Sequence, residues 1–161
     1  MAFDAFLKLD GISGDSFDKS HPGEIEVLGW EEGLTHPVSR GGAGGGAGAG
    51  KATFQDFHFT ARLSSATPKL LLACASGQHV KTATLSCRKA GGEQVFEFLK
   101  FVLDDVLVSS VKSGGSSADQ VVDTFTLNFA KIHVFFSTQS ATGAPGGTTS
   151  AGWDLANNKK A

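Results

Sequence analysis

The run from Gly45 to Lys51 is the first candidate for chemistry, because its spacing fits the phosphate-binding pattern G-x-x-x-x-G-K. Such a loop needs Ser or Thr after the lysine to hold magnesium, and position 52 is alanine. A helix must also follow, so that its N-terminal amides face the phosphate. A Phe-rich strand pattern follows here instead, and the sequence therefore argues against nucleotide binding.

Histidines and carboxylates give no second candidate. The five histidines are His21, His36, His58, His79 and His133. No two are spaced as a metal-binding pair, and no carboxylate cluster accompanies them in the sequence. Asp104 and Asp105 are neighbours, and neighbours in a strand point to opposite faces, so they do not pair as acid and base. Because no G-x-S-x-G motif is present either, the sequence predicts no enzyme, no metal site and no cofactor.

Length and charge exclude further classes of protein. The chain has 161 residues and a net charge of −2, so it lacks the basic surface that nucleic-acid binding needs. No apolar run approaches the ~20 residues of a membrane helix. The opening, MAFDAFLKLD, carries charges where an export signal needs an apolar core. We therefore expect one domain over residues 1–161, folded in the cytoplasm, with Cys74 and Cys87 as buried thiols.

Alternating apolar residues predict mostly strands. The expected strands are 3–9, 24–30, 53–63, 79–89, 121–136 and 152–155, with one or two more within 94–111. One short helix is expected, with Thr67 as N-cap, Pro68 as first residue and Gly77 as C-cap. Residues 31–51 and 138–150 are expected to be loops. Long strands with one helix are typical of an all-β barrel or sandwich.

The longest expected strand, 121–136, changes phase along its length. Its apolar residues are odd-numbered up to Phe129 and even-numbered from Ile132. A slip of one residue is what a β-bulge produces, so we expect an irregular residue between these two. The pair Asp104–Asp105 is expected to mark a bend or bulge in the preceding strand.

Segment 95–111 is apolar on both faces. One face can fill a barrel, but the other, which carries Phe96 and Phe98, needs a cover from the helix or from another subunit. Leu28 and Trp30 on the strand 24–30 likewise need a cover. An internal sandwich would also explain these residues. The interpretation we carry forward is a subunit interface that contains Leu28, Trp30, Phe96 and Phe98.

Several segments, in order over nearly the whole chain, resemble the hemolysin-coregulated protein (Hcp) family of bacterial type VI secretion systems. These segments are FLKLDGISGDS, EIEVLGW, TPKLLLACASG at 67–77, HVKTATLSCRKAGG, LDDVLVSSV, TFTLNFAKIHV and AGWDLANNKK. The resemblance implies a compact β-barrel with one short α-helix on its side and a long glycine-rich extended loop at 31–51.

The same resemblance implies a structural function. Six copies would form a ring, and rings would stack into a hollow tube that a contractile sheath surrounds and a valine-glycine repeat spike protein caps. Small effectors would travel in the lumen. The protein would assemble in the cytoplasm and be secreted by this machine without a signal peptide.

Two features depart from the family pattern. The glycine run 41–50 is longer than expected, and Cys87 stands where an aliphatic residue is expected, which could allow oxidative cross-linking. We expect residues 31–51 to form an arm that contacts the next ring. Its flanking charges would set the polarity of stacking by charge pairing; they are Glu31, Glu32, Arg40 and Lys51.

A function from another class stays open. The chain could be a small-molecule-binding β-barrel whose glycine-rich loop closes over the ligand. The mass in solution separates the two, because a tube protein forms a ring of about six chains and a binding module is a monomer with a pocket.

Overall fold

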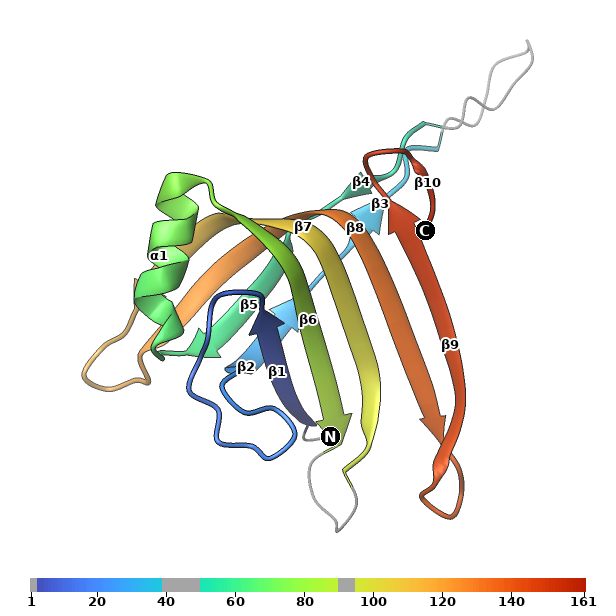
Figure 1. Cartoon of the computed structure of the whole chain (residues 1–161), viewed down its shortest axis with the longest axis horizontal. Coiled ribbons are helices and arrows are strands. Elements are labelled where there is room, and N and C mark those ends of the chain that lie inside the picture. The colour runs from blue at the N-terminus through green and yellow to red at the C-terminus, as the bar shows by residue number, and fades with distance from the viewer. Residues whose placement is uncertain (1–2, 39–49, 90–94) are drawn as a thin grey trace.

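The computed structural model describes residues 3–38, 50–89 and 95–161, which contain ten strands and one helix (Figure 1). The strands are β1 (Phe3–Leu9), β2 (Ile25–Glu31), β3 (Leu34–Thr35), β4 (Thr53–Phe54), β5 (Phe57–Arg62), β6 (His79–Lys89), β7 (Glu97–Gly114), β8 (Val122–Gln139), β9 (Pro145–Asp154) and β10 (Lys159–Lys160). The helix, α1, is Ala66–Ser76. In the described part of the chain no helix is long and apolar enough to cross a membrane.

Six of the strands close into a barrel. Hydrogen bonding runs in the order β8-β5-β2-β1-β6-β7, and β7 pairs back onto β8. Every neighbouring pair in this circuit is antiparallel. β9 and β10 extend the sheet beyond β8, and Figure 1 shows β9 on the opposite side of the molecule from α1. The mainly β fold, with a barrel and one short helix on its side, is therefore confirmed.

Phenylalanines fill the centre of the barrel. Phe57 and Phe59 on β5 and Phe125 on β8 are fully buried. Their rings stack in sequence, with centroids 4.7 Å apart for the first pair and 5.3 Å apart for Phe59 and Phe125. Removing one such side chain from water contributes roughly 1.5–3 kcal/mol. The alternation that predicted the strand over 53–63 comes from this stack.

The predicted phase change in β8 is present, but it is not a one-sided bulge. Buried residues switch from odd to even between Phe129 and Ile132. β7 makes the same switch opposite, between Leu103 and Val106, where Asp105 adopts a φ of 51°. Because both strands slip at one level, the β7–β8 register runs on unchanged across it.

β8 also changes its partner at this level. Residues 122–127 pair with β5, and residues 131–139 pair with β9. The backbone amide of Leu155, just after β9, donates to the carbonyl of Ala130 at 2.8 Å. The second half of β8 thus leaves the barrel circuit on one side and carries the β9 extension.

The prediction of a loop over residues 138–150 was wrong. β8 continues to Gln139, a tight turn follows with Gly143 at a φ of 85°, and Pro145–Asp154 is β9. The first seven residues of β9 are exposed, so this segment shows no alternation of apolar and polar residues. Its ladder with β8 holds it in place.

The helix starts earlier than predicted. Ser65, not Thr67, is the N-cap residue, although its side chain makes no capping hydrogen bond. Thr67 instead donates its hydroxyl to the buried carboxylate of Asp123 on β8, at 2.5 Å. Gly77 ends the helix in the left-handed conformation, with a φ of 67°, as predicted. The hydrogen bond from Thr67 to Asp123 fixes α1 to β8. The principal contacts of α1 are with β7.

The connection 31–51 has more structure at its base than predicted. β2 continues to Glu31, and β3 pairs with β4 to form a short two-stranded ladder. The two legs meet closely, because a Cβ on Gly50 would lie 2.7 Å from Cγ of Pro37. Residues 39–49, with most of the glycine run and Arg40, lie outside the described residues.

Candidate functional site

An apolar groove of about 590 Å³ lies at the base of the arm, between β3–β4 and the sheet of β7, β8 and β9. The arm side contributes Glu32, Leu34, His36, Gly50, Ala52 and Phe54. The sheet side contributes Phe101, Ile132, Val134, Ala151, Gly152 and Trp153, with Asn158 at the edge. Most of this lining is apolar, so the groove is suited to apolar groups rather than to a charged ligand.

The groove continues onto the inner sheet face, which we define as the core-facing side of β8 and β9 beyond the barrel. On β8 this face carries Ile132, Val134 and Phe136, opposite Trp153, Ala151 and Thr149 of β9. Exposure rises along β8 from 7 % at Ile132 to 49 % at Phe136. The barrel core therefore runs out into an apolar face that the described residues leave partly uncovered.

The outer edge of β9 is open over most of its length. Within the described residues it pairs there with β10 at Trp153 and Asp154, and the Ala161 amide donates to the carbonyl of Gly152. An open strand edge presents unpaired backbone N–H and C=O groups, and these can pair with a strand of another chain. The inner sheet face and this edge together form a surface suited to a protein neighbour.

The opposite side of the same sheet is covered by its own side chains. The Lys100 ammonium lies 4.8 Å from the centroid of the Phe135 ring, and His133 stacks on the same ring at 6.2 Å. His133 also fills the space above Gly152, where a Cβ would lie 2.3 Å from the imidazole. This outer side is more nearly complete within one chain than the inner sheet face.

Two of the predicted interface residues lie on β2 and point in different directions. Leu28 is 41 % exposed on the outside of the barrel. The register with β5 shifts between Val27 and Gly29, and this shift turns Trp30 inward. Its indole packs edge-on against Phe101 with centroids 5.3 Å apart. The expectation that both residues share an outer face was therefore wrong for Trp30.

The other two predicted interface residues lie near the start of β7. Phe96 is only 8 % exposed, with the Lys89 ammonium 6.0 Å from its ring centroid. Phe98 is half-buried, at an irregularity in the β6–β7 register. Their place at a subunit interface stays a prediction, as it does for Leu28 and Trp30.

The predicted stacking residues that the structure describes lie on the two legs of the arm, on either side of the β3–β4 ladder. Glu31 ends β2 and is exposed, as is Lys51 before β4. Glu32 lines the groove, and burial there raises the pKa of its carboxyl. Arg40 lies outside the described residues.

Three features first considered for their chemistry can be located in the described residues. Gly50 and Lys51 lead into β4, not into a helix. Across the described ranges no group of three or more His, Cys, Asp or Glu side chains is placed to hold a metal ion. Cys87 is fully buried, and burial raises the pKa of its thiol to about 11. The expectation that Cys87 allows oxidative cross-linking was therefore wrong for the folded chain.

Sequence reasoning missed the inner sheet face as a site. The even-numbered apolar residues after Phe129 were recognised, but their partners on β9 were assigned to a loop. One available signal was Trp153, which stands in register with Ile132 across the β8–β9 ladder. Alternation in β8 past the end of its β5 partner also marked an apolar face in need of a cover.

Comparison with known proteins gives a consistent result. A family described as "Type VI secretion system effector, Hcp" matches residues 6–136. Protein hcp1 of Pseudomonas aeruginosa is 45 % identical over 163 residues, covering all of both chains. The crystal structure of Hcp1 from Salmonella typhimurium is 36 % identical, with a TM-score of 0.82 over the whole of both chains. A structure described as a type six secretion system protein is 30 % identical and has a TM-score of 0.91, covering 99 % of this chain and 100 % of the other.

Proposed function

Since the chain belongs to the Hcp family of type VI secretion proteins, we propose that it is a structural component of the secretion tube. In this proposal six copies form a ring, and the rings stack into a hollow tube that a contractile sheath expels. The tube assembles in the cytoplasm and leaves the cell through the same machine. Its further partners are the valine-glycine repeat spike protein, the sheath proteins and small effectors held in the lumen.

The observation that supports a ring is the uncovered inner sheet face. Phe136 is 49 % exposed there, and Val134 and Trp153 are half-buried. Apolar surface of this kind is stabilised when another chain covers it, at about 25 cal/mol per Å² buried. We take a second copy of this chain as the occupant, because the open edge of β9 continues the same surface and offers backbone pairing.

A ring also needs the contact to be head-to-tail. The inner sheet face and the edge of β9 form one surface, and a different surface of the next copy must meet it if the assembly is to close by rotation. Leu28 lies on β2, which is across the barrel circuit from β7. In this proposal Leu28, on the outside of β2, belongs to the second surface.

Stacking of rings is assigned to the arm. Glu31 and Glu32 lie before β3 on one leg of the arm, and Lys51 lies before β4 on the other, so we expect opposite charges of successive rings to meet along the arm. Exposed charge pairs are screened by salt over about 10 Å at 0.1 M ionic strength. Stacking should then weaken as salt concentration rises, whereas the apolar contact within a ring should not.

The mass of the protein in solution tests the ring. Native mass spectrometry or light scattering should give about six times the chain mass of 16.7 kDa. A protein that stays monomeric up to high micromolar concentration would contradict the proposal.

A deletion of residues 41–50 tests the arm. We expect rings of unchanged mass that no longer stack or support secretion. A deletion variant that stacks and is secreted as well as the parent would show that the stacking contact lies elsewhere. Comparing the two proteins by electron microscopy at low and high salt separates ring formation from stacking.

The apolar groove favours a second candidate function, a small-molecule-binding barrel with the glycine-rich loop as a lid. Its volume of about 590 Å³ fits one apolar ligand, and both legs of the arm line it. The dye 1-anilinonaphthalene-8-sulfonate would bind a monomer of this kind with saturable fluorescence. In a ring that buries the inner sheet face, the same dye should bind only when the ring dissociates.

A further inference from the structure

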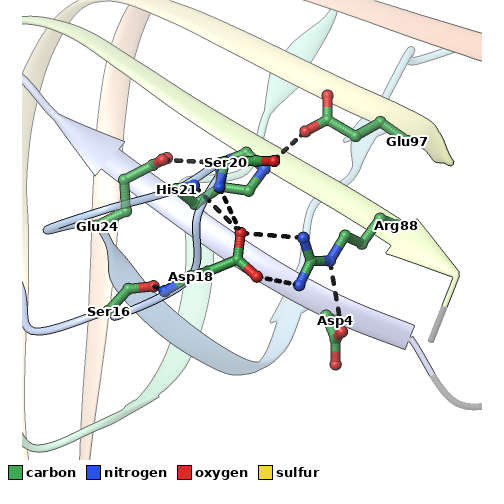
Figure 2. Close-up of polar contacts among 8 residues, drawn as sticks. All are labelled: Asp4, Ser16, Asp18, Ser20, His21, Glu24, Arg88 and Glu97. Atoms are coloured by element: carbon green, nitrogen blue, oxygen red, sulfur yellow. Dashed lines mark hydrogen bonds and ion pairs between the residues drawn. The ribbon is translucent and has the colours of Figure 1, made fainter. Parts of the chain in front are cut away.

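A buried histidine joins the loop between β1 and β2 to the barrel. His21 is 7 % exposed. Its Nδ1 lies 2.7 Å from Oε2 of Glu24 at the end of the same loop, and its Nε2 lies 2.6 Å from Oε1 of Glu97 on β7 (Figure 2). Both ring nitrogens thus face carboxylate oxygens, which are hydrogen-bond acceptors.

A second contact fixes the backbone that carries this histidine. The amides of Ser20 and His21 donate to Oδ1 of Asp18, at 2.9 and 3.2 Å. The Arg88 guanidinium on β6 donates to both oxygens of Asp18, with 3.0 Å from Nη1 to Oδ1, and from Nε to Asp4 on β1 at 3.4 Å. Figure 2 shows this chain of contacts running from the loop to β6 and β1.

An aromatic ring completes the attachment. Phe6 on β1 stacks with the His21 imidazole, with centroids 4.6 Å apart and planes 9° apart. The Arg88 guanidinium lies 4.9 Å from the same ring centroid. A flat cation over a phenyl face is attracted by the negative π-surface, and a protonated imidazole shares this property with the guanidinium.

The protonation of His21 decides how many of these contacts can form. A neutral imidazole has one N–H donor and one lone pair, so one of its nitrogens would face a carboxylate without a hydrogen. A doubly protonated ring donates to Glu24 and Glu97 together. The other charges around it are Asp18 in the loop, Asp4 on β1 and Arg88 on β6.

We propose that His21 is a proton-dependent clasp, which holds the segment of residues 18–24 on β7 through Glu97 when its ring carries two protons and releases that segment from β7 when one is lost. The segment adjoins Phe17, which is 97 % exposed. The proton on His21 therefore governs whether residues 18–24 are held against β7. The clasp lies within one chain, so it holds whether or not the chain forms rings.

The clasp has an acid limit as well as an alkaline one. The Arg88 hydrogen bond to Asp18 holds the pKa of that carboxyl below its usual value. A depressed carboxyl pKa adds stability that is present above the unfolded pKa and is lost as the pH falls through the folded one. Strong acid should loosen the Asp18 side, and loss of the His21 proton should loosen the Glu24 and Glu97 side.

Nuclear magnetic resonance of the ¹⁵N-histidine-labelled full-length protein tests the clasp without any substitution. The nitrogen shifts distinguish a doubly protonated ring from either neutral tautomer, and His21→Gln assigns the signal. Amide hydrogen exchange of residues 10–24 is measured at the same pH values. We expect exchange in residues 18–24, corrected for the intrinsic pH effect, to rise about tenfold or more as the ring loses its second proton.

A matched control is at hand. His79 also contacts a carboxylate, with Nδ1 2.7 Å from Oδ1 of Asp105, but both side chains are more than half exposed. His79→Gln should leave loop exchange and its pH dependence unchanged, while His21→Gln and Glu97→Gln should each remove the His21-linked step. A His21 ring with one proton while the loop is protected, or loop exchange indifferent to the second proton, would overturn the proposal.

Discussion

The two sides of the barrel differ in how far one chain completes them. On the side of β1, β2, β5 and β6, core residues such as Phe57 and Leu85 are at most 1 % exposed, and the loop before β2 is tied down through His21 and Arg88. On the side of the arm and β9, the same core opens onto the inner sheet face and Phe136 stays 49 % exposed. The first side buries its apolar residues within a single chain, whereas the second exposes apolar surface that the described residues of a single chain do not cover.

The largest effect is expected from breaking the closed side. Phe57→Ala removes the ring that stacks on Phe59 and packs edge-on against Phe101, with centroids 4.7 and 5.1 Å away. A cavity in a close-packed core should lower the free energy of unfolding by about 3–5 kcal/mol. Chemical denaturation of the variant and the parent measures this. A loss below about 1 kcal/mol would mean that the barrel collapses to fill the space.

Breaking the open side should change assembly and leave the fold intact. Phe136→Glu places a charge on the inner sheet face, where a neighbour would have to bury it at a cost of several kcal/mol. The mass in solution should fall from a ring to a monomer, with an unchanged circular dichroism spectrum. Leu71→Glu is the matched control, because Leu71 is 64 % exposed on α1, away from that face. A variant that keeps rings of the parent's mass would show that the neighbour contacts another surface.

The same contrast explains what could be predicted from the sequence. The strands of the closed side alternate because each has one face in the core, and residues such as Phe59 and Leu7 showed this directly. The β9 strand has seven exposed residues in succession, so its sequence carries no such signal. A strand held by a ladder rather than by burial cannot be recognised from polarity alone.

Two further features were missed for other reasons. One depends on a register shift of a single residue, and the other depends on a contact between residues far apart in the sequence. Trp30 turns inward because the β2–β5 register shifts after Val27, and no residue type near this position predicts the shift. The His21 contact with Glu97 spans 76 positions, so no spacing pattern around His21 could predict it. The chain fold creates this pair, and its geometry had to come from the structure.

Thiol labelling should distinguish Cys87, inside the closed side, from Cys74 on α1. Cys87 lies inside the closed side and burial raises the pKa of its thiol to about 11, so near pH 8 only about a thousandth of it is thiolate. Cys74 on α1 is half-buried. Maleimide should therefore label the folded protein once, at Cys74, and twice only after unfolding. Peptide mass mapping identifies the site, and Cys74→Ser should abolish the rapid step. Rapid labelling of Cys87 in the folded protein would mean that the barrel opens at that strand.

The smallest effect is expected at Glu32, where the open side begins. Burial in the apolar groove raises the pKa of this carboxyl, so the folded chain holds the charged form less readily than the unfolded chain does. A raised carboxyl pKa lowers stability above the folded pKa, and the loss is recovered as the pH falls and the folded state takes up the proton first. Glu32→Gln should therefore raise the free energy of unfolding near neutral pH. The gain should stay below about 1 kcal/mol, since solvent screens a group this exposed.

The pH dependence of that gain separates the groove from a general effect of charge. The difference between Glu32→Gln and the parent should shrink as the pH falls, because the parent's carboxyl becomes neutral as well. Glu31→Gln removes an adjacent charge from an exposed position at the end of β2 and should change stability little at any pH. Urea denaturation of the three proteins across the acid range measures both differences. Equal gains for the two variants would mean that the effect comes from net charge. A gain confined to Glu32→Gln would mean that a charged carboxylate in the apolar groove destabilises the single chain.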